Sequence, residues 1–237
     1  MENIRDFISF LFFGIIFYIN RDNQINNMAT KYSTKTAKNF NKWRKFFQYI
    51  TCCVIITSLR FKYNFKVEGK ELVEKKRKYI IASNHVTGID PFIIAAMLNI
   101  TIAYMAKKQL FETFWSTILM DWCGAFAVDR DKVDVSTIKT ALSIQKTDWN
   151  LGLFPQGTRC NNGKIEHVAK GFASIAKKIK ADVLPVGIIV QQIPNSKKKD
   201  FIIKVGKAIP YNDNVDNMVE NWSKTVSLLS GLQYVPQ

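Results

Sequence analysis

Residues 79–91 read YIIASNHVTGIDP and join a short apolar run to the start of a helix. The first five of these residues have the length and composition of a buried strand. Asp90 and Pro91 are typical of a helix start, because Asp caps a first turn and the fixed φ of Pro suits it. Polar residues therefore lie where a strand passes into a helix, which is where parallel sheets place their ligand sites.

The alternation of short apolar runs with longer helical ones continues along the chain from about Lys66. This alternation predicts an α/β fold with a mixed, largely parallel sheet flanked by helices. We predict strands at residues 79–83, 102–106, 125–128, 151–154, 183–190 and 202–205. We predict helices at residues 91–98, 110–122, 135–149, 170–179 and 217–232.

The chain combines high apolar content with high positive charge. Of its 237 residues 47% are hydrophobic, and 34 Lys and Arg against 19 Asp and Glu give a net charge of +15. The apolar content excludes a disordered chain, whereas the charge favours an anionic partner such as nucleic acid, anionic lipid or a phosphorylated substrate. The four cysteines lack the spacing of a metal site, so we expect no metal and reduced thiols in a cytosol-facing protein.

Residues 1–65 differ from the rest of the chain. Their two apolar runs, Phe7 to Ile19 and Phe46 to Leu59, reach only about 20 Å as helices, short of the ~30 Å hydrocarbon core of a bilayer. The stretch between them is basic and ends beside Trp43, as in segments that lie at a membrane surface. We therefore predict a membrane-associated two-helix segment over 1–65, followed by the α/β domain over 66–237. The alternative is two ordinary core helices joined by a solvated basic linker.

His85 and Asp90 form the first candidate pair. Thr87 and Gly88 let the loop turn tightly, so the two side chains can meet although five positions separate them. A carboxylate on one imidazole nitrogen fixes the tautomer and supports the cation that forms when the other nitrogen takes a proton. We interpret His85 as a general base. The pair taken alone equally allows a partly buried His and an Asp that only caps the helix.

Two other predicted strands end in cationic side chains. Residues 153–159, LFPQGTR, place Gly157, Thr158 and Arg159 after one strand. Backbone amides and a guanidinium fork suit a phosphate group. Residues 124–130, GAFAVDR, bring Arg130 to the end of another strand.

In this order and spacing the motifs resemble those of the glycerolipid acyltransferase family, typified by bacterial 1-acyl-sn-glycerol-3-phosphate acyltransferase. Asn84, His85 and Asp90 match the family's first motif, and Arg130 matches the Arg that ends its second. The third motif is usually Phe-Pro-Glu-Gly-Thr-Arg, and it is matched at Phe154, Pro155, Gly157, Thr158 and Arg159. The fourth motif is matched around Pro185.

The resemblance implies a role for each of these positions. His85 takes the proton of an acceptor hydroxyl, and Asp90 orients His85. Gln156 stands where the family usually has Glu; its amide keeps an acceptor and adds donors but holds no charge, so only an orienting role survives. The implied substrate-binding residues are Lys107, Arg130, Gln156, Gly157, Thr158 and Arg159.

The implied reaction moves a fatty acyl group from acyl-CoA or acyl carrier protein to the free hydroxyl of lysophosphatidic acid and gives phosphatidic acid, a step of phospholipid biosynthesis. No bound cofactor or metal is implied. The implied location is an anionic membrane surface, with a monotopic or peripheral protein whose active site faces the cytoplasm.

Two alternatives stay open at this point. The same fold can act on another acceptor, such as glycerol-3-phosphate or another lysolipid, because Gln156 departs from the family pattern. A basic nucleic-acid-binding protein is the other alternative. The sequence contains no evident nucleic-acid-binding motif, so we do not expect nucleic acid as a partner.

Overall fold

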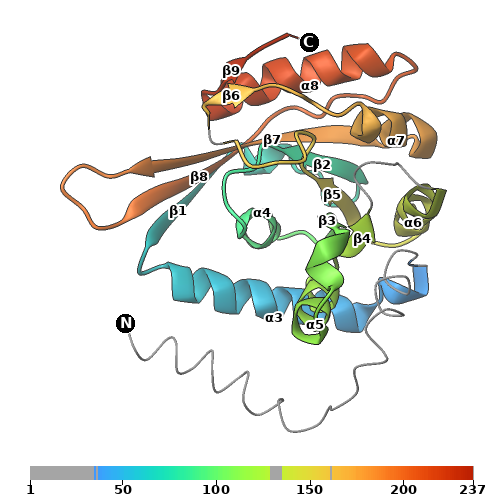
Figure 1. The fold of residues 1–237 in the computed structure, drawn as a ribbon, viewed down its shortest axis with the longest axis horizontal. Coiled ribbons are helices and arrows are strands. Elements are labelled where there is room, and N and C mark those ends of the chain that lie inside the picture. Colours follow the sequence, from blue (N-terminus) through green and yellow to red (C-terminus); the bar gives the residue numbers. More distant parts are fainter. Residues whose placement is uncertain (1–34, 36, 129–134, 161, 237) are drawn as a thin grey trace, which may run out of the picture.

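The computed structural model describes residues 35, 37–128, 135–160 and 162–236. Within these residues a seven-stranded sheet has the order β1-β8-β7-β2-β5-β3-β4 (Figure 1). Every neighbouring pair is parallel except β7 and β8, which confirms the predicted α/β fold with a largely parallel sheet. Its strands are β1 (Tyr63–Glu68), β2 (Tyr79–Ser83), β3 (Ile102–Lys107), β4 (Phe126–Val128), β5 (Asn150–Leu153), β7 (Asp182–Gln192) and β8 (Lys199–Val205).

Helices alternate with these strands along the chain. The helix predicted over 110–122 is divided, because Thr113 is extended and its side chain accepts a hydrogen bond from the N–H of Ser116, which starts a new helix. The helix predicted over 135–149 ends at Gln145. The described elements are η2 (Ala37–Asn39), α3 (Lys42–Leu59), η3 (Lys70–Leu72), α4 (Asp90–Leu98), η4 (Lys108–Phe111), α5 (Phe114–Trp122), α6 (Val135–Gln145), α7 (Gly171–Ile179) and α8 (Val215–Ser230), with β6 (Lys164–Ile165) paired to β9 (Gln233–Tyr234).

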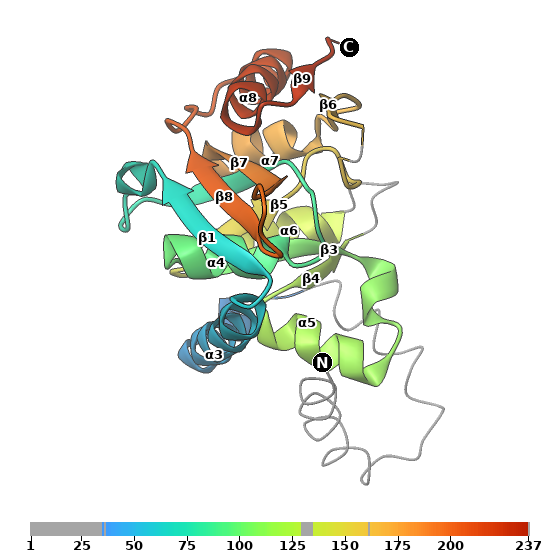
Figure 2. The same cartoon turned by 90° about the vertical axis from the view of Figure 1, so that its left-hand side faces the viewer.

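The central strand β2 separates two apolar cores. Because side chains alternate along a strand, Ile80 and Ala82 pack with α6, α7 and α8, whereas Ile81 packs with α3 and α4. Figures 1 and 2 show these helices on opposite sides of the sheet. The indole N–H of Trp222 on α8 also donates to the carbonyl of Ala82 at 3.0 Å, which fixes α8 over the end of β2.

The edge strand β1 was not predicted. Its polar residues Asn64, Lys66 and Glu68 alternate with Tyr63 and two half-buried apolar residues, so it lacks the continuous apolar run of the inner strands. Strand β8 is its partner in the sheet. The predicted boundary between residues 1–65 and 66–237 falls inside β1 and stays a prediction.

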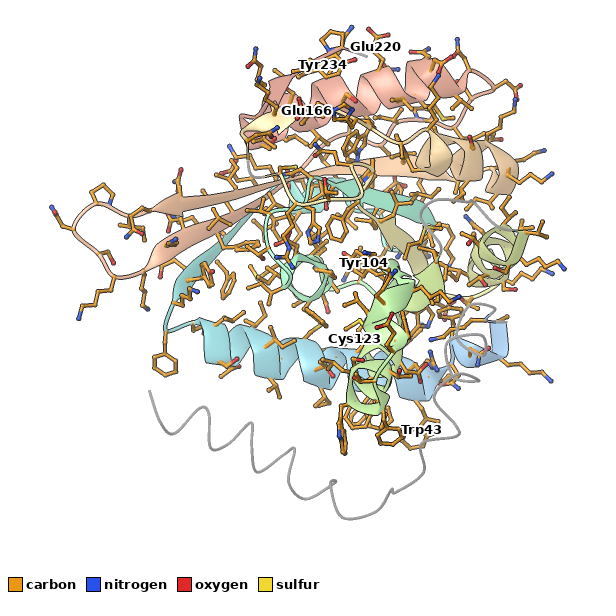
Figure 3. All side chains as sticks on the ribbon, viewed as in Figure 1. Trp43, Tyr104, Cys123, Glu166, Glu220 and Tyr234 are labelled. Carbon is orange, nitrogen blue, oxygen red and sulfur yellow. The ribbon has the colours of Figure 1, made fainter. Side chains whose placement is uncertain are left out.

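Helix α3 contains the second of the two N-terminal apolar runs and begins four residues before it. The side chain of Asn41 caps the helix by accepting from the N–H of Arg44. The helix packs against α4 and α5 and buries Gln48 and Cys52, whereas Trp43 points outward (Figure 3). In the described part of the chain, no helix has both the length and the apolar character needed to cross a bilayer. The first apolar run, Phe7 to Ile19, lies outside the described residues.

Candidate active site

His85 lies two residues after the end of β2, and Asp90 is the first residue of α4. The Nδ1 atom of His85 lies 2.7 Å from Oδ2 of Asp90. An ionised carboxylate only accepts hydrogen bonds, so beside it the neutral ring favours the tautomer with the proton on Nδ1 and the lone pair on Nε2. The fold therefore brings together the two residues that the sequence paired, in the tautomer that suits a general base.

Asp90 is fully buried, and its carboxylate is held by the loop that precedes it. Oδ2 accepts from the backbone N–H of Val86 at 2.6 Å and of Thr87 at 2.9 Å, and Oδ1 accepts from the Thr87 hydroxyl. Ile89 occupies the N-cap of α4, so the Asp90 carboxylate bonds back to residues 85–87 instead of capping the first turn. A buried charge needs such partners, and here they orient the imidazole as well.

Asn84 fixes the position of the backbone immediately before His85. Its buried side chain makes two bonds to the backbone of Ile188 on β7: Nδ2 donates to the carbonyl at 2.9 Å, and Oδ1 accepts from the N–H at 2.7 Å. The end of β2 is thereby tied to the neighbouring strand beyond the sheet's own hydrogen bonds.

A second loop, which follows β5, packs against the imidazole. The ring of Phe154 stacks on His85 with 4.1 Å between centroids and 18° between planes. The chain then turns at Gly157, whose φ of +68° lies in the left-handed region that favours glycine. The turn brings Cys160 back to the first loop, where its N–H donates to the carbonyl of His85 at 2.6 Å.

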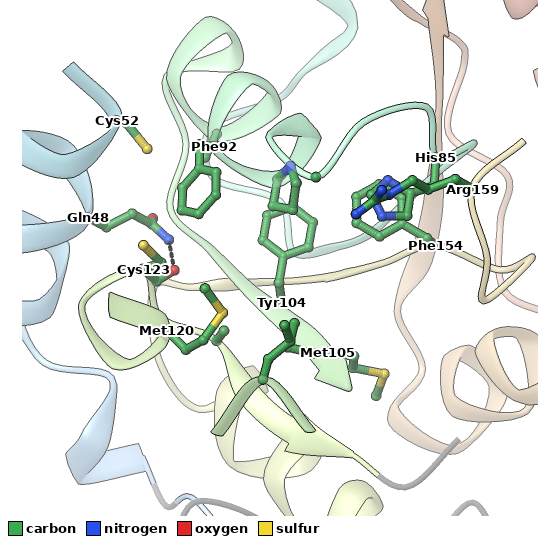
Figure 4. Close-up of a pocket in the computed structure, with 16 residues that line it drawn as sticks. Gln48, Cys52, His85, Phe92, Tyr104, Met105, Met120, Cys123, Phe154 and Arg159 are labelled. Carbon is green, nitrogen blue, oxygen red and sulfur yellow. Dashed lines mark hydrogen bonds between the residues drawn. The ribbon is translucent and has the colours of Figure 1, made fainter. Parts of the chain in front are cut away.

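Arg159 and His85 line the same cavity, which has a volume of about 230 Å³. A Cβ atom at Gly88 would lie 3.3 Å from Nη2 of Arg159, so the guanidinium lies close against the loop between His85 and Asp90. The rest of the cavity wall is mostly apolar. In Figure 4 the polar end holds His85 and Arg159, and the wall away from it includes Phe92, Met120 and Cys52.

Lys107 is the last residue of β3, and Arg130 follows β4 in the sequence. Lys107 is exposed at the end of β3 and lies outside the cavity wall that the described residues form. The register pairs Lys107 with Val128, the last residue of β4. Arg130 comes two residues later and lies outside the described residues.

The other predicted binding residues lie in the turn after Phe154. Gly157 forms the turn, and Thr158 is exposed next to Arg159. Gln156 directs its amide group toward backbone: Nε2 donates to the carbonyls of Lys164 at 3.3 Å and Glu166 at 3.4 Å. The amide N–H groups of Gln156 therefore bond to backbone carbonyls of the protein.

Among the cavity residues that the sequence did not predict are two polar ones, Gln48 and Tyr104. Gln48 on α3 closes the cavity by donating to the carbonyls of Ile102 at 2.8 Å and Cys123 at 2.6 Å. The sequence signal that could have identified Gln48 is that it is the single amide side chain in the apolar run from Phe46 to Leu59. Tyr104 also lines the cavity; its hydroxyl is buried without a hydrogen-bond partner among the described residues, and burial raises its pKa well above the ordinary value.

A sequence model of the acyltransferase family matches residues 64–189 of this chain. The chain belongs to the acyltransferase family. The match includes the His85–Asp90 pair and the Phe154–Arg159 loop, so the cavity between them is this acyltransferase's candidate active site.

Individual relatives of this acyltransferase carry a more specific name. The chain is 34% identical over 154 residues to a 1-acyl-sn-glycerol-3-phosphate acyltransferase of Bacillus subtilis, a match that covers 65% of this chain and 73% of the relative. A Streptococcus pneumoniae protein of the same name is 31% identical over 146 residues, covering 60% of this chain and 54% of the relative. In fold, the chain resembles the crystal structure of the 1-acyl-sn-glycerophosphate acyltransferase PlsC from Thermotoga maritima, with a TM-score of 0.58, 19% identity and coverage of 94% and 86%.

The cysteines of this acyltransferase differ widely in exposure. Cys52 and Cys123 are buried in the cavity wall, Cys53 is exposed and Cys160 is half-buried. Burial raises the pKa of Cys52 to about 12 and that of Cys123 well above its ordinary value. Both thiols therefore stay protonated at neutral pH. Within the described residues no group of three His, Cys, Asp or Glu side chains is arranged to hold a metal ion.

We predict that iodoacetamide at pH 8 labels Cys53 of the folded enzyme first and leaves Cys52 and Cys123 unmodified. The thiolate is the reactive form, and it is both rare and inaccessible at the two buried positions. Peptide mass spectrometry at successive times, with and without denaturant, measures the labelling. Equal rates at Cys52 and Cys53 in the folded enzyme would contradict the placement of α3 against the cavity.

Proposed function

We propose that this acyltransferase transfers a fatty acyl group to the free hydroxyl of 1-acyl-sn-glycerol-3-phosphate and so produces phosphatidic acid. The observation that carries the proposal is one cavity that holds His85, oriented by buried Asp90, together with the guanidinium of Arg159. The names of the relatives support the same acceptor. The acceptor contains the two groups that the cavity addresses, a hydroxyl for the imidazole and a phosphate for the guanidinium.

The reaction starts at Nε2 of His85. This nitrogen takes the proton of the acceptor hydroxyl, and the oxygen attacks the carbonyl carbon of the acyl thioester. Asp90 stabilises the imidazolium that forms, because its carboxylate already accepts from Nδ1–H. When the tetrahedral intermediate collapses, the carbon–sulfur bond breaks and the imidazolium returns its proton to the leaving thiolate. No covalent acyl-enzyme is required.

The phosphate fixes the acceptor for this attack. In this proposal Arg159 forms the phosphate site with the exposed Thr158, with Lys107 at the end of β3, and with Arg130, which follows β4 in the sequence. A bidentate guanidinium–phosphate contact provides orientation as well as attraction. Holding the hydroxyl near Nε2 in this way converts a bimolecular encounter into a positioned one, which is a large part of the expected rate enhancement.

The acyl donor is a thioester of coenzyme A or of acyl carrier protein. The apolar part of the cavity supports a hydrocarbon chain next to the reacting centre: Phe92, Leu110 and Met120 line it beside Tyr104. No bound cofactor or metal takes part in the proposed steps.

An acceptor comparison tests the proposed function. Purified enzyme is supplied with one acyl-CoA or acyl carrier protein donor and with 1-acyl-sn-glycerol-3-phosphate, glycerol-3-phosphate or 1-acyl-glycerophosphocholine. We expect the highest kcat/KM for 1-acyl-sn-glycerol-3-phosphate, measured as labelled product on thin-layer chromatograms. Preference for either of the other acceptors would contradict the proposal.

The His85→Ala variant serves as the mechanistic control. Loss of a positioned general base lowers kcat by roughly 10²–10⁴-fold, and we expect this without a change in KM of similar size. The His167→Ala variant is the matched control, because His167 is exposed and lies outside the cavity wall. Full activity of His85→Ala would rule out His85 as the base.

We also propose that the enzyme works as a monotopic or peripheral protein at an anionic membrane surface, with its active site facing the cytoplasm. The supporting feature is an α3–α5 apolar face on the outside of two neighbouring helices. Phe47 of α3 and Trp122 of α5 stack across it, with 5.1 Å between ring centroids. This face consists of the exposed side chains Trp43, Phe46, Phe47, Tyr49, Ile50, Val54, Leu119 and Trp122.

Cations accompany the α3–α5 apolar face. Residues 23–67 contain no Asp or Glu. At the C-terminal end of α3, Arg60 and Lys62 flank Phe61, whose side chain is 78% exposed. The β7–β8 hairpin adds the exposed Lys197 and Lys199 beside them, since the N–H of Lys199 donates to the carbonyl of Lys62 at 3.0 Å. Apolar rings with cations at their border fit the boundary between acyl chains and anionic headgroups.

Vesicle flotation tests the membrane proposal. We expect the enzyme to float with vesicles of phosphatidylcholine and phosphatidylglycerol and to bind pure phosphatidylcholine more weakly. The Arg60→Glu/Lys62→Glu variant should bind the anionic vesicles at least about tenfold more weakly, since each cation near such a surface contributes about 1 kcal/mol. Lys178→Glu, on α7 across the sheet, is the charge control and should bind normally. Absence of flotation, or equal binding to both vesicle types, would contradict the proposal.

A further inference from the structure

Two side chains in the loop after β5, those of Gln156 and Cys160, are hydrogen-bonded to each other. Oε1 of Gln156 accepts a hydrogen bond from the thiol of Cys160. The amide nitrogen of Gln156 donates to the carbonyls of Lys164, on β6, and Glu166, just beyond it. Gln156 therefore links the start of the loop to the segment around β6 through its amide nitrogen. Through its amide oxygen it also holds Cys160, at the end of the loop.

Cys160 extends this connection to the backbone of the catalytic histidine. Its backbone N–H donates to the carbonyl of His85 at 2.6 Å, while its thiol points to Gln156. The thiol is half-buried, and this burial raises its pKa, so it stays protonated and keeps its role as a donor. A continuous set of hydrogen bonds thus runs from β6 through Gln156 and Cys160 to His85.

We propose that Gln156 and Cys160 are a positioning pair that holds Arg159 at a fixed distance from His85, and so determines how well the acceptor phosphate is bound. The inference rests on the proposed function, in which Arg159 receives that phosphate. Arg159 is exposed and directly precedes Cys160, so the backbone on either side of it sets where its guanidinium lies.

This arrangement requires an amide at position 156. The nitrogen faces two carbonyl oxygens and must donate, whereas the oxygen faces a thiol and must accept. A carboxylate satisfies the second demand but places an oxygen against two other oxygens, which is repulsive. The pairing accounts for Gln156 in this chain as a residue that supports the loop and does not contact substrate.

The pair acts on Arg159, and it touches His85 only through the backbone N–H of Cys160, a bond that neither side chain makes. Asp90 is held by Val86 and Thr87, and Asn84 is held by Ile188, so neither contact passes through Gln156 or Cys160. We therefore expect its loss to weaken binding of phosphate-bearing acceptors, while proton transfer at His85 continues once acceptor is bound.

A double-mutant cycle measures the pair. We expect Gln156→Ala and Cys160→Ala each to raise KM for the phosphate acceptor about three- to tenfold, the loss of one or two neutral hydrogen bonds. The double variant should be no worse than the poorer single variant, because either change breaks the same connection. Cys160→Ser should approach wild type, since a hydroxyl also donates, and Gln156→Glu should behave like Gln156→Ala. Cys53→Ala, on the exposed side of α3, is the matched control.

Three further readouts separate positioning from general stability. For the single variants we expect unchanged kcat at saturating acceptor, unchanged pH dependence of kcat and an unchanged KM for the acyl donor. Independent, multiplicative effects of the two substitutions would overturn the pair. A decrease in kcat and in the unfolding midpoint, together with a rise in the KM for the acyl donor, would also overturn it. Failure of the proposed function appears separately, as a wild-type enzyme that prefers another phosphate acceptor, and the same cycle is then measured on that acceptor.

Discussion

The buried carboxylate of Asp90 is the constraint on which the site depends. With no solvent to stabilise its charge, it collects hydrogen bonds from two backbone N–H groups, a hydroxyl and the imidazole of His85. Removing any one of them leaves a buried charge less well compensated, at a cost of about 1–3 kcal/mol. The loop from β2 to α4 therefore has one low-energy conformation, and that conformation aims Nε2 of His85 away from Asp90.

The parallel sheet converts this local constraint into a binding site. The ends of β2, β3 and β5 lie side by side at one edge, so loops that are distant in sequence meet there. The Phe154 ring packs on His85, and Arg159 follows within the same loop. Helix α3 completes the cavity from the other side through Gln48 and Cys52, while its outer face carries aromatic rings. The cavity and the proposed membrane-facing surface thus lie on two sides of one helix.

Much of this arrangement could be predicted from the sequence. Inner strands are continuous apolar runs, so β2, β3, β5 and β7 were recognisable, and the tight Thr87-Gly88 turn indicated that His85 and Asp90 can meet. The edge strand β1 escaped because every second residue is polar. The contribution of α3 to the cavity escaped because an apolar run does not reveal which of its faces is buried. The hydrogen bonds of Gln156 depend on Cys160, Lys164 and Glu166, and such a set becomes visible only when the loop is folded.

The central claim is that Asp90 holds His85 as the Nδ1–H tautomer with Nε2 free to accept a proton. The chain has two histidines, so ¹⁵N NMR of the His167→Gln variant reports on His85 alone. For the neutral ring we predict a protonated Nδ1 and an unprotonated Nε2, with a loss of this tautomer preference in Asp90→Ala. A neutral His85 that carries its proton on Nε2 would contradict the account.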